Sequence, residues 1–280
     1  MHAGPAIGIM QGRLTPPVRG IQAFPRERWR DEFPAGQAAG LDFIEWIFDL
    51  YGADVNPLMS AKGVQELRSL SKSSGVAVYS LCADYFMDCP LLKCSPLEQE
   101  ERLKVLKTLL AQCKALDIHH VVLPFVDASR IDSAEEETDF VKMVLEKILP
   151  EAEKSRIEIH LETSLPPQGV AALLARVPHE LFWINYDSGN SSSLGYNATE
   201  EFGAYGKRIG SFHIKDRVLG GTTVPLGTGG ADFAALAECV KRVNYKRPFV
   251  LQVARGESGQ EIEWAKKNRA SAETLLKLKD

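Results

Sequence analysis

The chain has 280 residues and a mass of 30.9 kDa, with 45% hydrophobic and 25% charged residues. This composition is ordinary for a globular protein with a buried core, and it excludes a disordered or fibrous chain. The 33 Lys and Arg residues are outnumbered by 37 Asp and Glu residues, which gives a formal net charge of -4. Because proteins that bind a phosphate backbone usually carry a basic excess, we expect no nucleic-acid partner.

The sequence carries no sign of membrane insertion or export. No apolar run reaches the roughly 18 residues that span a bilayer, and the first residues lack the basic and apolar segments of a secretory signal. The five cysteines include no Cys-x-x-Cys pair, which is typical of free thiols in a reducing compartment. We therefore expect a cytoplasmic protein without a membrane partner; its oligomeric state stays open, with a homo-oligomer as one option.

Short apolar runs alternate with longer amphipathic segments from one end of the chain to the other. Each short run is typical of a buried strand, and each longer segment can form a helix. In chain order, the predicted strands cover 7–10, 43–46, 76–81, 120–123, 157–161, 182–185, 209–214 and 249–253.

Helical spacing and capping residues mark the clearest helices between these strands. Ser95 and Glu98 form a capping box, with proline at the first helical position and leucines every three or four residues after it. Ser133 and Glu136 repeat the capping signature further along the chain. The predicted helices cover 95–116, 140–149 and 260–278.

Eight strand runs, each followed by a helical stretch, predict a parallel sheet with crossover helices. Eight such units in about 250 residues match a closed (β/α)₈ TIM barrel, an α/β fold. An open doubly wound sheet is the alternative, but the segment 8–12 reads Gly-Ile-Met-Gln-Gly rather than the dinucleotide fingerprint. Since no linker divides the chain, we predict a single domain over residues 1–280.

Polar residues end or follow nearly every predicted strand. Because the carboxyl ends of barrel strands surround one mouth, we expect these side chains to form a pocket there. They are Gln11, Arg13, Glu45, Asp84, Asp127, Glu162, Asp187, His213 and Gln252.

Glu162, Asp187 and His213 are the candidate metal ligands within this set. Two carboxylates in a partly desolvated pocket repel each other unless a cation lies between them. Oxygen ligands with one imidazole suit Mn²⁺, Mg²⁺, Co²⁺ or Zn²⁺, and the amide oxygen of Gln252 could supply a fourth ligand. Ordinary loop hydrogen bonds or ion pairs are the alternative, because ligands scattered along the chain form no local motif.

Several short segments at successive strand ends match a known family. The segments are 8–14, 40–46, 160–162, 187–190, 213–217 and 225–229, which read GIMQGRL, GLDFIEW, HLE, DSGN, HIKDR and PLGTG. Together they resemble the xylose isomerase-like TIM-barrel superfamily, which includes sugar-phosphate isomerases, epimerases and endonuclease IV. The resemblance implies that Glu162, Asp187 and His213 hold a divalent metal ion.

The eighth strand departs from the epimerases of that family. There the resemblance implies a second glutamate, which faces the first across the substrate carbon so that one removes a proton and the other returns it. This chain has Gln252, which can ligate through its carbonyl oxygen but cannot act as a base. Two-base C3 epimerisation is therefore disfavoured, whereas one-base aldose–ketose isomerisation is not. Lys215 is a candidate replacement acid, or else a surface lysine paired with Asp216.

Further residues are candidates for binding the substrate. Arg13, Arg217 and Arg255 could bind a phosphate or carboxylate bidentately, or could form surface ion pairs. Glu45 and Asp84 would bind sugar hydroxyls. The full predicted substrate-binding set is Gln11, Arg13, Glu45, Asp84, Asn190, Asp216, Arg217 and Arg255.

Two weaker features complete the interpretation of the site. The glycine-rich segment 225–230 follows the seventh strand, where barrels often bind phosphate, but it could equally be a flexible lid. His160 alternates in register with Glu162, so it could orient that carboxylate or be a core histidine. His119 and His120 precede the apolar part of the fourth strand and receive no role.

The sequence thus predicts a divalent-metal-dependent isomerase or epimerase of a small sugar, sugar acid or sugar phosphate. Glu162 would remove a proton beside the carbonyl, and the metal ion would stabilise the enediolate. A sugar-binding barrel that has lost turnover is one alternative, motivated by Gln252. An endonuclease IV-like phosphodiesterase is a second, disfavoured by the six histidines and the negative charge.

Overall fold

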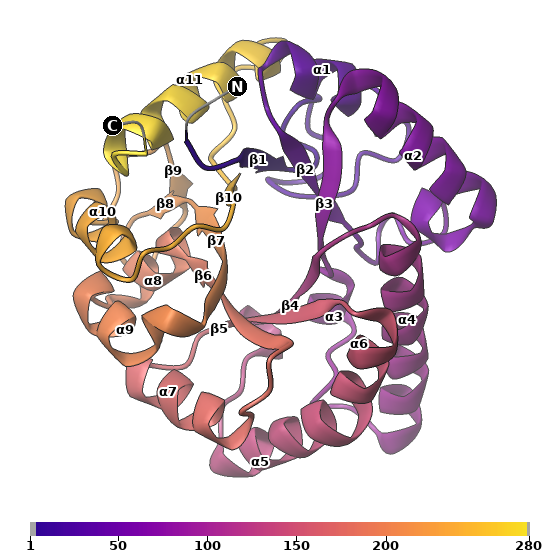
Figure 1. Ribbon diagram of the computed structural model, residues 1–280, viewed down its shortest axis with the longest axis vertical. Coiled ribbons are helices and arrows are strands. Elements are labelled where there is room, and N and C mark those ends of the chain that lie inside the picture. Colours follow the sequence, from indigo (N-terminus) through magenta and orange to yellow (C-terminus); the bar gives the residue numbers. More distant parts are fainter. Residues whose placement is uncertain (1–3, 279–280) are drawn as a thin grey trace.

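A closed barrel of eight parallel strands forms the centre of the molecule (Figure 1), in a computed structural model that describes residues 4–278. Each strand pairs with the next barrel strand along the chain, and the last pairs in parallel with the first. The predicted (β/α)₈ barrel is therefore confirmed. Its strands are β1 (Ile7–Met10), β2 (Phe43–Ile47), β3 (Ala77–Cys82), β4 (His120–Phe125), β5 (Glu158–Thr163), β6 (Phe182–Asp187), β7 (Ile209–Ile214) and β10 (Phe249–Leu251).

Helices surround the barrel, and α11 lies beside α1, so that the ring of helices closes (Figure 1). None of the helices between residues 4 and 278 is long and apolar enough to cross a membrane. The helices are α1 (Glu32–Ala38), α2 (Ala61–Ser74), α3 (Tyr85–Asp88), α4 (Pro96–Ala115), α5 (Ala134–Met143), α6 (Leu149–Ser155), α7 (Pro167–Arg176), α8 (Ser188–Leu194), α9 (Ala198–Tyr205), α10 (Phe233–Arg242) and α11 (Glu261–Leu275), with short 3₁₀ turns at Pro57–Met59, Asp127–Ser129 and Gly206–Arg208.

The core lies between the strands and the helices that cover them. Every residue of β4 and β7 is buried, as expected for parallel strands packed on both faces. Trp46 of β2 is fully buried, and its ring centroid lies 5.8 Å from the rings of both Phe24 and Trp29. This packing holds the segment before α1 against β2.

The helix predicted over 95–116 is confirmed as α4, with the capping box of Ser95 and Glu98 formed. The prediction over 140–149 is wrong in its bounds. A continuous helical stretch starts at Ala134, directly after Ser133, passes through a π-helical turn at Val144–Ile148 and ends with α6. Pro150 explains the turn, because it has no N–H to donate and its ring crowds the carbonyl four residues earlier.

Several strand ends also differ from the prediction, which moves the site residues relative to their strands. The strands β4, β5 and β6 each continue two residues further than predicted, because their pairing with neighbours continues as far as Phe125, Thr163 and Asp187. By contrast, β10 ends at Leu251, where its last register partner on β7 is Ile214. The carboxylates of β5 and β6 therefore belong to regular strands rather than to mobile loops.

Candidate metal centre and substrate pocket

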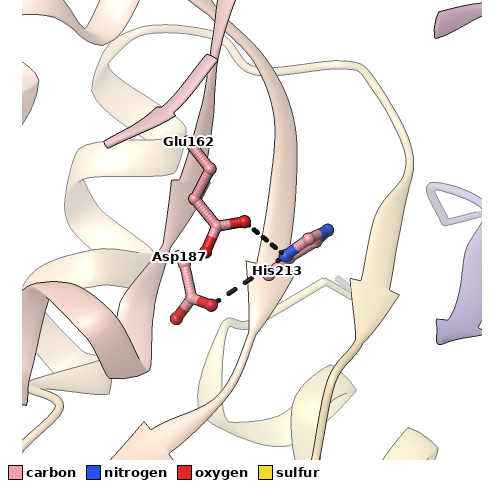
Figure 2. A group of neighbouring side chains, drawn as sticks. All are labelled: Glu162, Asp187 and His213. Carbon is pink, nitrogen blue, oxygen red and sulfur yellow. Dashed lines mark ion pairs between the residues drawn. The ribbon is translucent and has the colours of Figure 1, made fainter. Parts of the chain in front are cut away.

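Glu162, Asp187 and His213 meet near the carboxyl ends of three neighbouring strands, β5, β6 and β7 (Figure 2). Asp187 is the register partner of His213. One ligand atom from each of the three side chains lies within 4.8 Å of the others, and all three are buried. Both carboxylates point towards the imidazole ring (Figure 2). The structure thus brings together the three residues that the sequence predicts as metal ligands.

The His213 ring is oriented by Glu45, which lies behind it. The ring Nε2 is 2.6 Å from Glu45 Oε1, and Ser80 Oγ donates to the other Glu45 oxygen at 2.6 Å. This contact turns Nδ1 towards the carboxylates, 3.5 Å from Glu162 and 3.9 Å from Asp187. Glu45 is fully buried and does not line the pocket. It therefore positions the imidazole of His213 and does not bind a sugar hydroxyl, in contrast to the sequence prediction.

The charge of this group favours a cation. Burial alone would lower the pKa of His213, but Glu45 and Glu162 outweigh it and raise the pKa to about 10. An imidazole that ligates a metal ion must be neutral at the ligating nitrogen, so binding of a metal ion here would release a proton. Two carboxylates with one imidazole are the ligands that Mn²⁺, Co²⁺ and Zn²⁺ accept, and the donor set therefore fits a divalent ion.

Two asparagines hold the Glu162 carboxylate in place. Asn185 Nδ2 donates to Glu162 Oε2 at 2.9 Å and lies 3.0 Å from His213 Nδ1, while Asn190 Nδ2 donates to Glu162 Oε1 at 2.6 Å. The sequence analysis missed Asn185, although its place two residues before Asp187 puts both side chains on one face of β6. Asp187 caps α8 by accepting from the Asn190 backbone N–H at 2.8 Å, which orients its carboxylate.

Lys215 points into the site and does not pair with Asp216 at the surface. Its Nζ lies 3.4 Å from Asp187 Oδ2, 3.3 Å from Asn190 Oδ1 and 3.2 Å from Gln252 Oε1. A Cβ at Gly189 would come within 2.5 Å of the lysine side chain, so this path requires glycine. The alternative of a surface ion pair with Asp216 is therefore wrong.

A cavity of about 430 Å³ opens above these residues at the barrel mouth. Its wall includes carboxylates, amides and cations, the groups that can bind the hydroxyls of a polar ligand. Seven residues from the predicted site and mouth line it: Asp84, Asp127, Glu162, Asn190, Lys215, Arg217 and Gln252.

Three other predicted substrate-binding residues do not line the cavity, and their side chains instead hydrogen-bond to backbone groups of β2 or of the loops around the barrel mouth. Gln11 accepts a hydrogen bond from the Ile47 backbone N–H. Arg13 donates to the carbonyl oxygens of Ile21 and Val253, and Arg255 donates to those of Thr15 and Ile21. Burial, with Arg255 nearby, lowers the pKa of Arg13 to about 9. These contacts are structural.

Asp216 organises the glycine-rich segment that the sequence singled out after the seventh strand. Asp216 begins the short strand β8 (Asp216–Arg217), which pairs antiparallel with β9 (Thr223–Val224). Its carboxylate accepts from the backbone N–H groups of Gly227, Gly229 and Ala231. These amides are therefore already bonded to a carboxylate, which leaves them unavailable to a phosphate group. Asp216 itself is outside the cavity lining.

Gln22 lines the cavity and was missed by the sequence analysis. It lies in an irregular loop that has no periodic pattern, so no sequence signal marks it. Its Nε2 donates to Asp84 Oδ2 at 2.6 Å, and its Oε1 accepts from Gln252 Nε2 at 3.1 Å. Burial raises the pKa of Asp84 to about 6. The cavity wall thus contains a connected set of amides and carboxyl groups.

His160 is a core histidine and does not contact Glu162. Its Nδ1 lies 2.7 Å from Ser211 Oγ, and its Nε2 lies 2.9 Å from Glu158 Oε2, towards the amino ends of the strands. His120 stacks on it with ring centroids 3.9 Å apart. Of the two interpretations of His160, the structure supports the core residue.

Comparisons with known proteins agree with this architecture. A putative L-ribulose-5-phosphate 3-epimerase, SgbU from Haemophilus influenzae, is 21% identical over 89% of this chain and 87% of its own. The structure of an IolI protein with a bound zinc atom has a TM-score of 0.76 at 17% identity, covering 98% of this chain and 99% of that one. D-psicose 3-epimerase with D-tagatose, from Clostridium cellulolyticum H10, has a TM-score of 0.76 at 15% identity, covering 97% and 99%.

A family model decides the classification. The model described as the xylose isomerase-like TIM barrel matches residues 33–277, which include the strands that carry Glu162, Asp187 and His213, and Gln252 directly after β10. The relatives and structural neighbours named above include sugar epimerases. The chain belongs to the xylose isomerase-like TIM-barrel family.

Proposed function

We propose that the protein is a metal-dependent isomerase or epimerase of a small sugar or sugar derivative. The observation that carries the proposal is the convergence of Glu162, Asp187 and His213 beside a polar cavity at the carboxyl end of the barrel. The sugar epimerases among the relatives support the reaction class.

A divalent ion held by Glu162, Asp187 and His213 would supply Lewis-acid stabilisation of the charge that develops on a sugar carbonyl when a neighbouring proton is removed. The chain's own residues prepare that site. Glu45 holds the imidazole so that Nδ1 faces the carboxylates, and Asn185 donates to the Glu162 carboxylate. None of these groups has to reorganise when the charge develops.

Glu162 is our candidate for the base that removes the proton. It is the carboxylate of the three-residue group that lines the cavity, and two amide donors fix its orientation. A carboxylate held in this way meets a substrate carbon in one direction, which is the requirement for general-base catalysis.

The return of the proton has two routes in this chain, because Gln252 cannot supply it. Lys215 Nζ lies 3.2 Å from Gln252 Oε1 and lines the cavity, so its ammonium could protonate the opposite side of the same carbon. That route would give epimerisation. Alternatively, Glu162 returns the proton to the neighbouring carbon, which would give aldose–ketose isomerisation.

The test is exchange of substrate protons with solvent. Mn²⁺-loaded protein is incubated with a panel of ketoses in D₂O, and carbon-bound deuterium is located by NMR. We expect deuterium to enter at one carbon, and Glu162→Gln to slow this by about 10²–10⁴-fold, the usual contribution of a general base. Glu100→Gln, on the exposed face of α4, is the matched control.

The position of the label separates the two routes. Epimerisation is indicated by deuterium at the carbon that inverts, together with loss of that label in Lys215→Met. Isomerisation is indicated by deuterium at the neighbouring carbon, with little effect of Lys215→Met on the label. If no ketose in a broad panel exchanges and Glu162→Gln changes nothing, the proposed catalysis is wrong.

A sugar-binding barrel without turnover is the second candidate function. It is favoured by Gln252 and by Lys215, whose ammonium already pairs with Asp187. This alternative requires tight binding of a polyol with no solvent exchange. A phosphodiesterase with a histidine-rich centre has less support, because the group of potential ligands found among residues 4–278 contains a single histidine.

A further inference from the structure

A directed chain of hydrogen bonds crosses the wall of the cavity and ends at the candidate metal centre. Lys215 Nζ donates to Gln252 Oε1 at 3.2 Å, and Gln252 Nε2 donates to Gln22 Oε1 at 3.1 Å. Gln22 Nε2 in turn donates to Asp84 Oδ2 at 2.6 Å, and Arg13 Nη2 donates to Gln22 Oε1 at 3.2 Å. Every donor in this chain meets an acceptor.

The amide orientations in this chain follow from chemistry, because lysine and arginine can only donate. The Gln252 atom next to Lys215 must therefore be its oxygen, and its amide nitrogen must face Gln22. The Gln22 atom next to Arg13 must likewise be oxygen, which is the atom that Gln252 meets. The two cations, Lys215 and Arg13, thus fix the amide orientations of Gln252 and Gln22 independently.

Arg13 is a firm anchor for this arrangement. Its Nε donates to the Val253 carbonyl oxygen at 2.9 Å and its Nη1 to the Ile21 carbonyl oxygen at 2.6 Å, so the position of Nη2 is set by backbone. Both Arg13 and Gln252 are only 5% exposed. A flipped Gln22 would place two donors against each other in this partly buried location, which is unfavourable.

We propose that Gln22 is a positioning residue that holds the side-chain amide of Gln252 with its oxygen turned towards Lys215. Gln252, directly after β10, then presents a neutral oxygen to whatever cation occupies the centre. The inference rests on the proposed function only where that cation is a divalent metal ion.

The same geometry couples the identities of residues 22 and 252. A glutamate at position 252 would turn an acceptor towards Gln22 Oε1, which already accepts from Arg13. Relief by flipping Gln22 would place its NH₂ group against Arg13 and its oxygen against Asp84. The glutamine of the eighth strand is therefore matched to a residue 230 positions away in the sequence.

A double-variant cycle on metal affinity tests the proposal. Mn²⁺ binding is measured by calorimetry for wild type, Gln22→Met, Gln252→Met and the double variant. Both substitutions leave the net charge of the protein unchanged. We expect Gln22→Met to weaken Mn²⁺ binding by about fivefold, as for loss of one hydrogen bond. Because Gln22 acts through Gln252, we expect no further weakening when Gln22→Met is added to Gln252→Met. Gln37→Met, on the exposed face of α1, is the control.

Two results would overturn the inference. Gln22→Met could bind Mn²⁺ as tightly as wild type, or it could weaken binding equally in the presence and absence of Gln252, as a general distortion of the site would. A second cycle, on the Tm of the same four proteins in EDTA, does not depend on a metal ion. There we expect the double variant to lose less than the sum of the single losses, and additive losses would contradict the hydrogen-bonded pair.

This design separates the inference from the proposed function. If wild type binds no Mn²⁺ but the Tm cycle shows coupling, the metal-dependent function fails and the orientation of Gln252 by Gln22 stands. If wild type binds Mn²⁺ and both cycles are additive, the role of Gln22 fails and the metal centre stands.

Discussion

The two ends of the barrel interior contain similar residue types in very different states. At the amino ends of the strands, which we call the floor, Glu158 forms a two-pronged ion pair with Arg247 and meets His160 Nε2 at 2.9 Å. At the mouth, Glu162 meets only amide donors and the His213 ring. The floor therefore neutralises its carboxylate with an arginine, whereas the mouth does not.

The difference shows what distinguishes a structural cluster from a candidate active site. Despite partial burial, His160 and Arg247 lower the pKa of Glu158 to about 2, so that the floor is a closed set of paired charges. At the mouth Glu45 and Glu162 instead raise the pKa of His213 to about 10, and the Lys215 ammonium lies 3.4 Å from Asp187. Three carboxylates gathered around one imidazole cost stability and are expected where a cation binds.

We expect the largest effect from a change that removes a candidate metal ligand at the mouth and leaves the fold intact. Asp187→Asn removes one charged ligand but retains an oxygen that can cap α8. We expect Mn²⁺ affinity to fall by more than about 100-fold, since the carboxylate contributes both charge and a ligand. The Tm in EDTA should stay within a few degrees of wild type or rise. Calorimetry and thermal unfolding measure the two quantities, and a variant that binds Mn²⁺ normally would contradict the assignment.

At the floor we expect the opposite result: a loss of stability with little change in Mn²⁺ affinity. Arg247→Met leaves the Glu158 carboxylate without its arginine, so we expect unfolding to become easier by about 2 kcal/mol, as for loss of a hydrogen bond to a charged group. Mn²⁺ affinity should stay within about twofold of wild type, because the floor does not contact the metal ligands. Arg176→Met, which breaks an exposed pair with Glu137, is the matched control and should cost less than about 1 kcal/mol.

The pH dependence of that variant follows from the pKa of Glu158. This pKa is lowered in the folded protein from 4.5 to about 2, so the ionised carboxylate stabilises the fold above pH 4.5 and the contribution is lost as the pH falls towards 2. The stability difference between wild type and Arg247→Met should therefore be constant above pH 5 and shrink below pH 4.5. A difference that grows on acidification would show that the pair is not the cause.

The sequence predicts the fold and the metal ligands for the same reason. Apolar runs with helical stretches between them give the eight strands, and the carboxyl ends of parallel strands meet at one mouth. Glu162, Asp187 and His213 end such runs, so their convergence follows from topology. The helix bounds over 134–155 were less predictable, because Pro150 distorts the helix without ending it.

The parts of the site that sequence reasoning missed depend on contacts between distant loops. Gln22 bonds to Gln252 across 230 residues, and no local pattern indicates that pairing. Arg13 and Arg255 appeared suited to an anion, but their donors are used by backbone carbonyl oxygens that become neighbours only in the folded chain. Side-chain chemistry identifies what a residue can bind, whereas the fold decides which partner lies within hydrogen-bonding distance.

The central claim is that the mouth binds a divalent metal ion through Glu162, Asp187 and His213. A crystal of the Mn²⁺-loaded protein, measured for anomalous scattering of manganese, tests it most directly. We expect one strong peak bonded to these three side chains, with Gln252 Oε1 also turned towards it and Lys215 displaced from Asp187. Absence of a peak there at saturating Mn²⁺, with Lys215 still paired to Asp187, would contradict the account.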